Sequence, residues 1–431
     1  MYVVLSVILL LVFLVMGVPV AFSFTAATVF LMVTLGYSPA FLMPYGYSKL
    51  VNPVLLCIPL FIIAGSIIRR GKLGDALISF VEQFVGRFRS GLGSVTIVTC
   101  AIFGAISGSA GATLSCVGSI MAPKLRERGY SRGVAGSLIA SSAVLALLIP
   151  PSAAQVLFAW SAGQSVLACF LSTVIPGIIL VILFCIIQHF QLLNDLKNKP
   201  ANVVIKEPST EKMTWKSFTK NTGFALPALV MPVIILGGIY SGFFTPTESA
   251  GIACVAAYLI GRFVYKEISL HNLPTILVDS AKQSTVIMFI IACATAFSYF
   301  FSYAGLTKSL TQFVLSCHMS PTVFLLFCFV LLVIFGMFMD GTSIAVLLVP
   351  LLWPVAKELG IDVIHFGIVF CILNSLGCCT PPVAVNLFGM ANISGLSVGE
   401  ITKGEMPFFI ANLCVVLLII FVPAVTAWVV G

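Results

Sequence analysis

Apolar stretches long enough to cross a bilayer, about 20 residues each, follow one another along most of the chain, separated by short basic or small-residue segments. The first stretch has no Lys or Arg ahead of it, which favours a retained membrane helix over a cleaved signal peptide. It continues to Gly36, so we expect two helices that separate at residues 17–19. The pattern predicts an all-α polytopic membrane protein with about ten crossings.

Composition supports the same class of protein. Hydrophobic residues make up 60% of the chain and charged residues only 8%. The net charge of +8 comes from basic clusters at the ends of apolar runs, which is typical of cytoplasmic loops. We therefore expect the lipid bilayer as the main surrounding and no nucleic-acid partner. The thirteen cysteines form no CxxC pair, so neither redox chemistry nor a thiolate metal site is favoured.

Residues 91–129 are too many for one helix, yet basic residues flank both sides of this segment. A re-entrant hairpin explains this pattern, with its turn in residues 104–115, the first tip, which is dense in Gly, Ala, Ser and Thr. Non-helical backbone at membrane depth must be buried in protein or line a polar cavity. The amphipathic stretch at residues 75–89, just before the hairpin, is expected to lie along the interface.

Two double-proline segments, residues 148–158 and 379–388, interrupt apolar runs, and a pair of prolines breaks a helix. An offset of 231 residues aligns Pro123 with Pro354, Pro150 with Pro381, Pro151 with Pro382, Gln155 with Asn386 and Pro176 with Pro407. The counterpart of the first tip is residues 336–345, the second tip, whose flanks are much less basic. We therefore predict two inverted halves, which are typical of secondary transporters with a site at the midplane.

The predicted first inverted repeat covers residues 1–190, a long cytoplasmic linker covers 191–221, and the second repeat covers 222–431. In the first repeat we expect scaffold helices at 1–70, an interfacial arm helix at 75–89, a re-entrant hairpin at 91–129, a broken helix at 132–163 and a helix at 165–190. In the second repeat we expect scaffold helices at 222–303, an arm at 306–317, a hairpin at 320–358, a broken helix at 361–393 and a helix at 405–429.

Broken helices leave carbonyl and N–H groups that lipid cannot satisfy, so they offer binding positions for cations and anions. The side chains near the tips and breaks are oxygen donors, a set that favours a hard cation such as Na⁺ over a transition metal. Small hydroxyl residues also allow close helix packing, which is the alternative role for any single Ser here. These candidates are Ser107, Ser109, Thr113, Ser152, Gln155, Asp340, Thr342, Ser343, Thr380 and Asn386.

Asp340 is the one acidic residue that we expect at membrane depth, where a carboxylate indicates ion or proton binding. Capping of the broken helix is the structural alternative for this residue. Neither tip and neither double-proline segment contains Lys or Arg. An anionic substrate is therefore expected to bind through hydroxyls, amides, backbone N–H groups and bound cations, an arrangement that couples the substrate to the ion.

The first tip with its "MAPKL" exit, the "LIPPS" segment and "CTPPVAVNLF" resemble the large membrane subunit of the TRAP (tripartite ATP-independent periplasmic) transporters, and most of all its sialic-acid members. The resemblance covers essentially the whole chain. It implies an elevator-type Na⁺ symporter in the bacterial inner membrane that imports an organic acid such as N-acetylneuraminate. It also implies a separate small four-helix membrane subunit and a periplasmic substrate-binding protein.

By position, the resemblance implies at least two Na⁺ sites and a substrate site between the tips. One Na⁺ site would use Ser107, Ser109 and Pro150, and the other would use Asp340, Thr342 and Thr380. The substrate-binding residues would be Thr113, Ser152, Gln155, Ser343 and Asn386.

Other functions fit the sequence less well. An intramembrane serine protease needs a base near its nucleophile, and the four histidines fall at or near the ends of spans. No phosphate-binding G-x-x-x-x-G-K-[ST] loop supports ATP-driven transport. A channel, or a Na⁺/dicarboxylate-type carrier of the same architecture that needs no binding protein, stays open as an alternative.

Overall fold

The computed structural model describes residues 2–38, 40, 42–86, 90–197, 215–381 and 384–423, and within these ranges the regular elements are helices. Among the described residues, seven helical stretches are long and apolar enough to cross a membrane, fewer than the ten or so predicted, because several apolar runs divide into helices of 14–17 residues. The seven are Arg132–Ala162, Val166–Lys197, Thr222–Tyr240, Pro246–Val264, Leu273–Tyr303, Gly341–Glu358 and Val398–Phe421.

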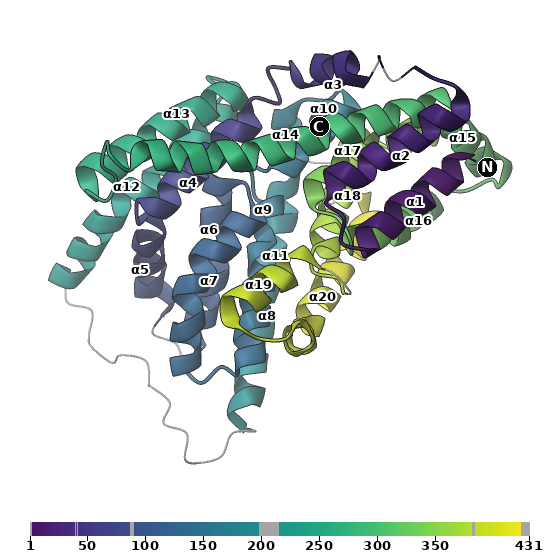
Figure 1. The fold of residues 1–431 in the computed structure, drawn as a ribbon. Coiled ribbons are helices and arrows are strands. Elements are labelled where there is room, and N and C mark those ends of the chain that lie inside the picture. The colour runs from purple at the N-terminus through teal and green to yellow at the C-terminus, as the bar shows by residue number, and fades with distance from the viewer. Residues whose placement is uncertain are drawn as a thin grey trace.

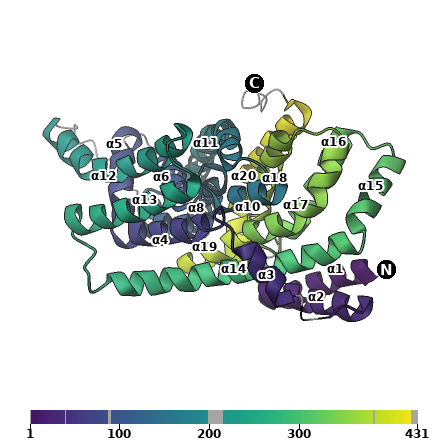
Figure 2. The same ribbon diagram turned by 90° about the horizontal axis from the view of Figure 1, so that it is seen from above.

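One group of helices lies along one side of the rest of the protein and reaches both of its ends, and we call it the frame (Figures 1 and 2). Its helix α14 runs across the molecule and packs on α2, α3 and α4, while α4 packs on α13 and α5 packs on α12. An ion pair of 2.6 Å between Arg70 of α4 and Asp279 of α14 joins two of these helices. The frame consists of α1 (Tyr2–Val15), α2 (Val20–Leu35), α3 (Leu42–Leu50), α4 (Cys57–Arg70), α5 (Leu73–Val85), α12 (Trp215–Tyr240), α13 (Pro246–Leu259) with the π-helical turn Ile260–Val264, α14 (Leu273–Tyr303) and α15 (Leu306–Ser316).

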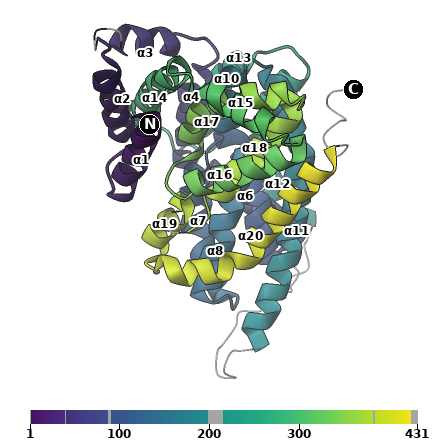
Figure 3. The ribbon, with the colours of Figure 1, turned by 90° about the vertical axis from the view of Figure 1, so that its right-hand side faces the viewer.

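The remaining helices form the second group, the bundle (Figure 3). Aromatic side chains fill its centre; for example, the Phe158 ring lies 5.6 Å from that of Phe370, and the Phe184 ring lies 5.1 Å from that of Phe408. The bundle consists of α6 (Gly91–Ser107), α7 (Ala110–Glu127), α8 (Arg132–Ala143), α9 (Leu145–Leu148), α10 (Ala153–Ala162), α11 (Val166–Lys197), α16 (Pro321–Gly336), α17 (Gly341–Glu358), α18 (Val363–Gly377), α19 (Val385–Ser394) and α20 (Val398–Phe421).

Helices of the bundle correspond at a nearly constant spacing along the chain. Helix α16 starts 230 residues after α6, α17 starts 231 after α7, α18 starts 231 after α8, α19 starts 232 after α10, and α20 starts 232 after α11. Their packing is reciprocal: α7 contacts α19 while α17 contacts α10, and α8 contacts α20 while α18 contacts α11. Each half of the chain therefore completes the core of the other.

Several boundaries differ from those predicted. Helix α11 continues to Lys197 and α12 starts at Trp215, so both ends of the predicted linker 191–221 are helical; the extension of α11 is held because Leu192 is buried and the Gln191 amide donates to the Gly404 carbonyl. Helix α20 starts at Val398, before the predicted residue 405, because Ser397 and Glu400 form a capping box. Helix α5 ends at Val85, and residues 87–89 of the predicted arm lie outside the described ranges.

Candidate functional site

The first tip is a tight turn between α6 and α7. Helix α6 ends at Ser107, Gly108 has a φ of 61°, and Ser109 caps the first turn of α7 by accepting from the Ala112 N–H. The Ser107 hydroxyl lies 3.2 Å from that of Thr113, which donates to the Ser109 carbonyl at 2.9 Å. Gly108 is required here because its backbone is left-handed and an added Cβ would lie 2.7 Å from the Pro151 carbonyl oxygen. The first tip therefore directly contacts the first double-proline segment.

The helix that starts as α8 ends at Leu148 and resumes as α10 at Ala153; we call residues 149–152 the first break. A continuous helix would pair the Leu147 carbonyl with the N–H of residue 151, but that residue is a proline. The Gln155 amide nitrogen replaces the missing donors, at 3.0 Å from the Leu147 carbonyl oxygen and 2.8 Å from that of Leu148. The Ser152 hydroxyl is buried and has no hydrogen-bond partner within the described part of the chain.

Asp340 is the N-cap of α17 in the second tip. Its carboxylate accepts from the Thr342 N–H at 3.0 Å and from the Thr342 and Ser343 hydroxyls. The geometry therefore shows the alternative role given for Asp340, capping of the helix. The carboxylate has two oxygens, so further lone pairs are left to bind an ion. Next to it, the Asn374 amide donates to the Gly341 carbonyl at 3.1 Å, while its own buried oxygen has no partner in the described residues.

The second break separates α18 from α19. Thr380 donates its hydroxyl to the Leu376 carbonyl at 2.8 Å, and the Asn386 N–H donates to the Cys378 carbonyl at 3.2 Å. The Ala384 N–H donates to the Met337 carbonyl at 3.1 Å, which ties this break to the second tip. Pro382, half of the second double proline, lies outside the described residues.

Both tips meet around one cavity of about 290 Å³, together with residues that flank the two breaks: Leu147 and Ala153 at the first, and Cys378 and Val385 at the second. Of the predicted residues, it is lined by Ser107, Ser109, Asp340, Thr342 and Asn386. The others are not part of its wall: Thr113 and Ser343 lie behind it, bonded to Ser107 and Asp340, and Pro150, Ser152, Gln155 and Thr380 also lie away from it.

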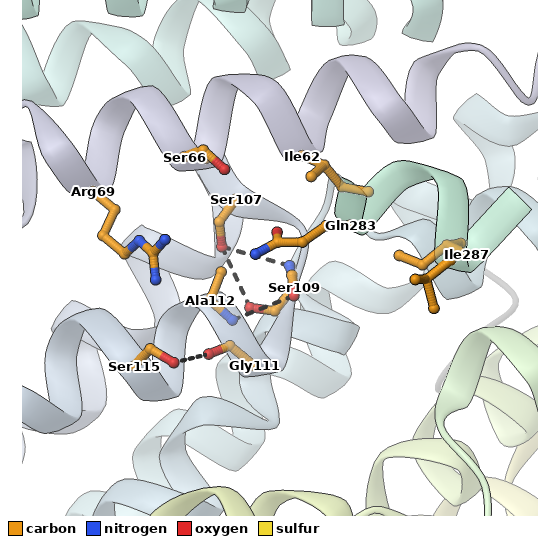
Figure 4. Close-up of a pocket in the computed structure, with 12 residues that line it drawn as sticks. Ile62, Ser66, Arg69, Ser107, Ser109, Gly111, Ala112, Ser115, Gln283 and Ile287 are labelled. Atoms are coloured by element: carbon orange, nitrogen blue, oxygen red, sulfur yellow. Dashed lines mark hydrogen bonds between the residues drawn. The ribbon is translucent and has the colours of Figure 1, made fainter. Parts of the chain in front are cut away.

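A second cavity of about 490 Å³ adjoins the first, because Ser107, Ser109, Gly111 and Ser115 line both (Figure 4). Its opposite wall belongs to the frame, with Ser66 and Arg69 from α4 and Gln283 from α14. Sequence reasoning missed these residues. Arg69 belongs to a basic cluster at the end of an apolar run, and such clusters were used only to predict the topology. Gln283 lies in the most polar part of α14, where one more polar residue did not stand out.

Glu405 is a buried carboxylate that the sequence analysis did not single out. Glu405 in α20 is 3% exposed and lies next to the Cys379 thiol at the second break. Packing of α20 on α8 buries it, and Gly404 permits the close approach because an added Cβ there would collide with the Ser137 side chain. Its sequence context, two residues after Lys403, looked like the exposed start of a helix.

Comparisons with known proteins agree on one family. The family "Tripartite ATP-independent periplasmic transporter, DctM component" matches residues 7–425. The chain is 33% identical over 372 residues to the C4-dicarboxylate TRAP transporter large permease protein DctM of Pseudomonas aeruginosa, covering 86% of this chain and 85% of that protein. It is 29% identical over 415 residues to the sialic acid TRAP transporter permease protein SiaT of Haemophilus influenzae, covering 96% of this chain but 66% of that longer protein.

Among solved structures, the chain resembles the Alcanivorax borkumensis YdaH transporter, with a TM-score of 0.62, 16% identity and coverage of 90% of this chain and 88% of that one. This likeness concerns the fold alone. The matching relatives are transporter permeases, not enzymes, so a protease function is excluded for this chain.

Proposed function

The chain belongs to the TRAP transporter family as its DctM component, the large permease, and from this premise we propose that it imports an organic acid across the bacterial inner membrane by Na⁺ symport. The observation that carries the proposal is the convergence of the two tips, and of the helix ends beside the two breaks, on one cavity. Broken helices that meet at a common site are the arrangement by which secondary transporters hold ions and substrate.

The two halves are proposed to be inverted repeats, with α6–α7 and α16–α17 as re-entrant hairpins that open to opposite sides of the membrane. The nearly constant spacing of the helix starts and the reciprocal packing of the bundle support a repeat. In an elevator mechanism the bundle would carry the site across the membrane while the frame stays in place. Residues 198–214, in the proposed cytoplasmic linker, lie outside the described ranges.

Two Na⁺ ions are proposed as co-transported cargo, one at each tip. The first site would use the Ser107 hydroxyl, the Ser109 carbonyl and the backbone at Pro150; the unpaired, buried hydroxyl of Ser152 lies beside it. The second site would use Asp340, Thr342 and Thr380; the unpaired oxygen of Asn374 lies beside the same tip. The donors are hydroxyl, carbonyl and carboxylate oxygens, which suit a hard cation.

The substrate is proposed to bind between the tips, with Asn386 and Ser109 as its polar contacts in the cavity wall. Thr113, Ser152 and Ser343 would act from behind these residues. Gln155 is better explained by its bonds to Leu147 and Leu148 than as a substrate ligand. A small four-helix membrane subunit, as a separate chain, and a periplasmic binding protein complete the proposed transporter.

For the substrate, we keep sialic acid as the narrower proposal, on the likeness to SiaT and the tip motifs. The more similar DctM relative transports C4-dicarboxylates by its name, so succinate is the competing substrate. Proteoliposomes that contain the chain, its small subunit and its binding protein distinguish them by uptake of labelled N-acetylneuraminate or succinate.

In the same vesicles, replacing external Na⁺ by choline is expected to abolish uptake, and omission of the binding protein is expected to do the same. Conduction without a Na⁺ gradient would show a channel. Uptake without the binding protein would show an independent carrier of the same architecture.

A further inference from the structure

The cavity of about 490 Å³ lies between the frame and the bundle, beside the proposed sites at the tips, with which it shares Ser107 and Ser109. Its frame side carries a guanidinium, an amide and a hydroxyl, from Arg69, Gln283 and Ser66. Its bundle side carries Ser109 and Ser115 (Figure 4). The volume falls in the range of small-molecule sites, ~300–1,000 Å³.

Arg69 has no ion pair among the residues that the structure describes, unlike three basic residues near it, Arg70, Lys72 and Lys124. Arg70 binds Asp279 at 2.6 Å, Lys72 binds Glu267 at 2.7 Å, and Lys124 binds Glu82 at 3.2 Å. The hydrogen bond to Glu267 raises the pKa of Lys72, so the Lys72 ammonium stays charged and paired with Glu267. Arg69 instead extends from α4 toward α7 and lines the cavity, as Figure 4 shows.

We propose that Arg69, with Gln283 and Ser66, forms a second binding station for an organic carboxylate, on the frame, beside the substrate site of the tips. Arginine suits this role because its planar guanidinium donates two parallel hydrogen bonds to a carboxylate and is weakly hydrated. The two cavities share the wall at Ser107 and Ser109, so an acid that leaves the tips toward α4 meets this guanidinium next.

The inference deepens the proposed function, since it presumes an organic acid as the substrate. It also provides a positive charge for the carboxylate, since neither tip contains Lys or Arg. As the substrate leaves the tips, its carboxylate would lose its contacts with the bundle and gain contacts with Arg69 on the frame. The new contacts would assist release of the substrate from the bundle. The basic residues at the end of α4 are of the cytoplasmic type, so the station would act on the cytoplasmic side.

The direct test is protection of Arg69 from phenylglyoxal, an arginine-selective reagent, in the purified full-length chain in nanodiscs. Peptide mass spectrometry compares labelling in sodium succinate or sodium N-acetylneuraminate with sodium chloride at equal ionic strength. An acid present at about ten times its dissociation constant is expected to slow Arg69 labelling about tenfold. Arg126 in α7, which does not line this cavity, is the control and is expected to react equally in every salt.

Equal labelling of Arg69 in all three salts would overturn the station. Repetition in choline salts separates this inference from the proposed Na⁺ coupling. Protection that persists without Na⁺ supports the station even if uptake proves independent of Na⁺. Normal Na⁺-driven uptake without protection of Arg69 would contradict the second binding station but not the proposed function.

Transport gives a second measurement in proteoliposomes loaded with unlabelled acid. Arg69→Gln is expected to raise the half-saturating internal acid concentration for counterflow about tenfold, the cost of one charge-assisted hydrogen-bond pair, with the external KM unchanged. Arg69→Lys should restore part of the loss. Arg70→Gln, which removes a guanidinium already paired with Asp279, is the matched control and should leave counterflow near wild type. Identical internal affinities in the Arg69→Gln and wild-type proteins would contradict the station.

Discussion

Replacement of Gln155 by methionine tests how the first break is held. The Gln155 amide donates to the carbonyl of Leu147, whose helical partner would be Pro151, and to that of Leu148, whose helical partner Ser152 lies across the break. It also lies 3.1 Å from the Thr173 hydroxyl. Methionine keeps the unbranched shape but removes the donors. Hydrogen bonds in membrane proteins contribute on average ~0.6 kcal/mol and at most ~1.7 kcal/mol each. Loss of two bonds to buried carbonyls is therefore expected to lower the free energy of unfolding by about 1–4 kcal/mol.

The assay is unfolding of the purified protein in mixed micelles with increasing dodecyl sulfate, followed by circular dichroism. Gln164→Met is the matched control, because Gln164 is exposed just beyond α10. Uptake at saturating substrate, normalised to folded protein, should stay near wild type with an unchanged KM. If Gln155→Met left the unfolding curve unchanged and raised the KM several-fold, the amide would serve the substrate and not the helix break.

Three further predictions follow from the tips, the second break and the core. Asp340→Asn keeps one of the two acceptor oxygens of the N-cap, so the protein should still insert and fold, while Na⁺-driven uptake falls at least tenfold. Thr380→Ala should also abolish uptake, and normal Na⁺ dependence in both variants would remove the second ion site. Gly377→Ala should destabilise the protein by about 1–3 kcal/mol, measured in the same unfolding assay, because its methyl would lie 2.6 Å from the Gly336 Cα. Glu405→Gln should be at least as stable as wild type, because burying an ionisable group is costly, and a lower melting temperature would reveal a charged partner.

The tips and breaks were predictable because Gly and Pro act locally. A proline lacks its N–H wherever the chain places it, and a run of small residues such as 104–115 favours close packing or a turn over a lipid-facing surface. Both rules identify positions without any knowledge of the tertiary structure. The start of α17 follows in the same way from Asp340 as an N-cap, whereas the Ser109 cap of α7 was not predicted.

The roles of Gln155, Arg69 and Glu405 were not predictable in this way, since each depends on a distant neighbour. Gln155 looked like a substrate ligand because the sequence does not reveal that its amide folds back on the preceding helix. Arg69 has the same local context as Arg70, and only the position of Asp279 distinguishes them. Glu405 is buried because α8 lies against α20, a contact between the two halves of the chain.

The reciprocal packing of the bundle bears on how the protein is made. Helix α7 depends on α19, and α8 depends on α20, yet both partners leave the ribosome only after most of the chain has been synthesised. The first hairpin, α6–α7, and the broken helix next to it must therefore lie in the membrane for some time before α19 and α20 can pack against them. A nascent chain truncated before α16 should remain bound to the insertion machinery or its chaperones, and a chain released at that point becomes a substrate for membrane proteases.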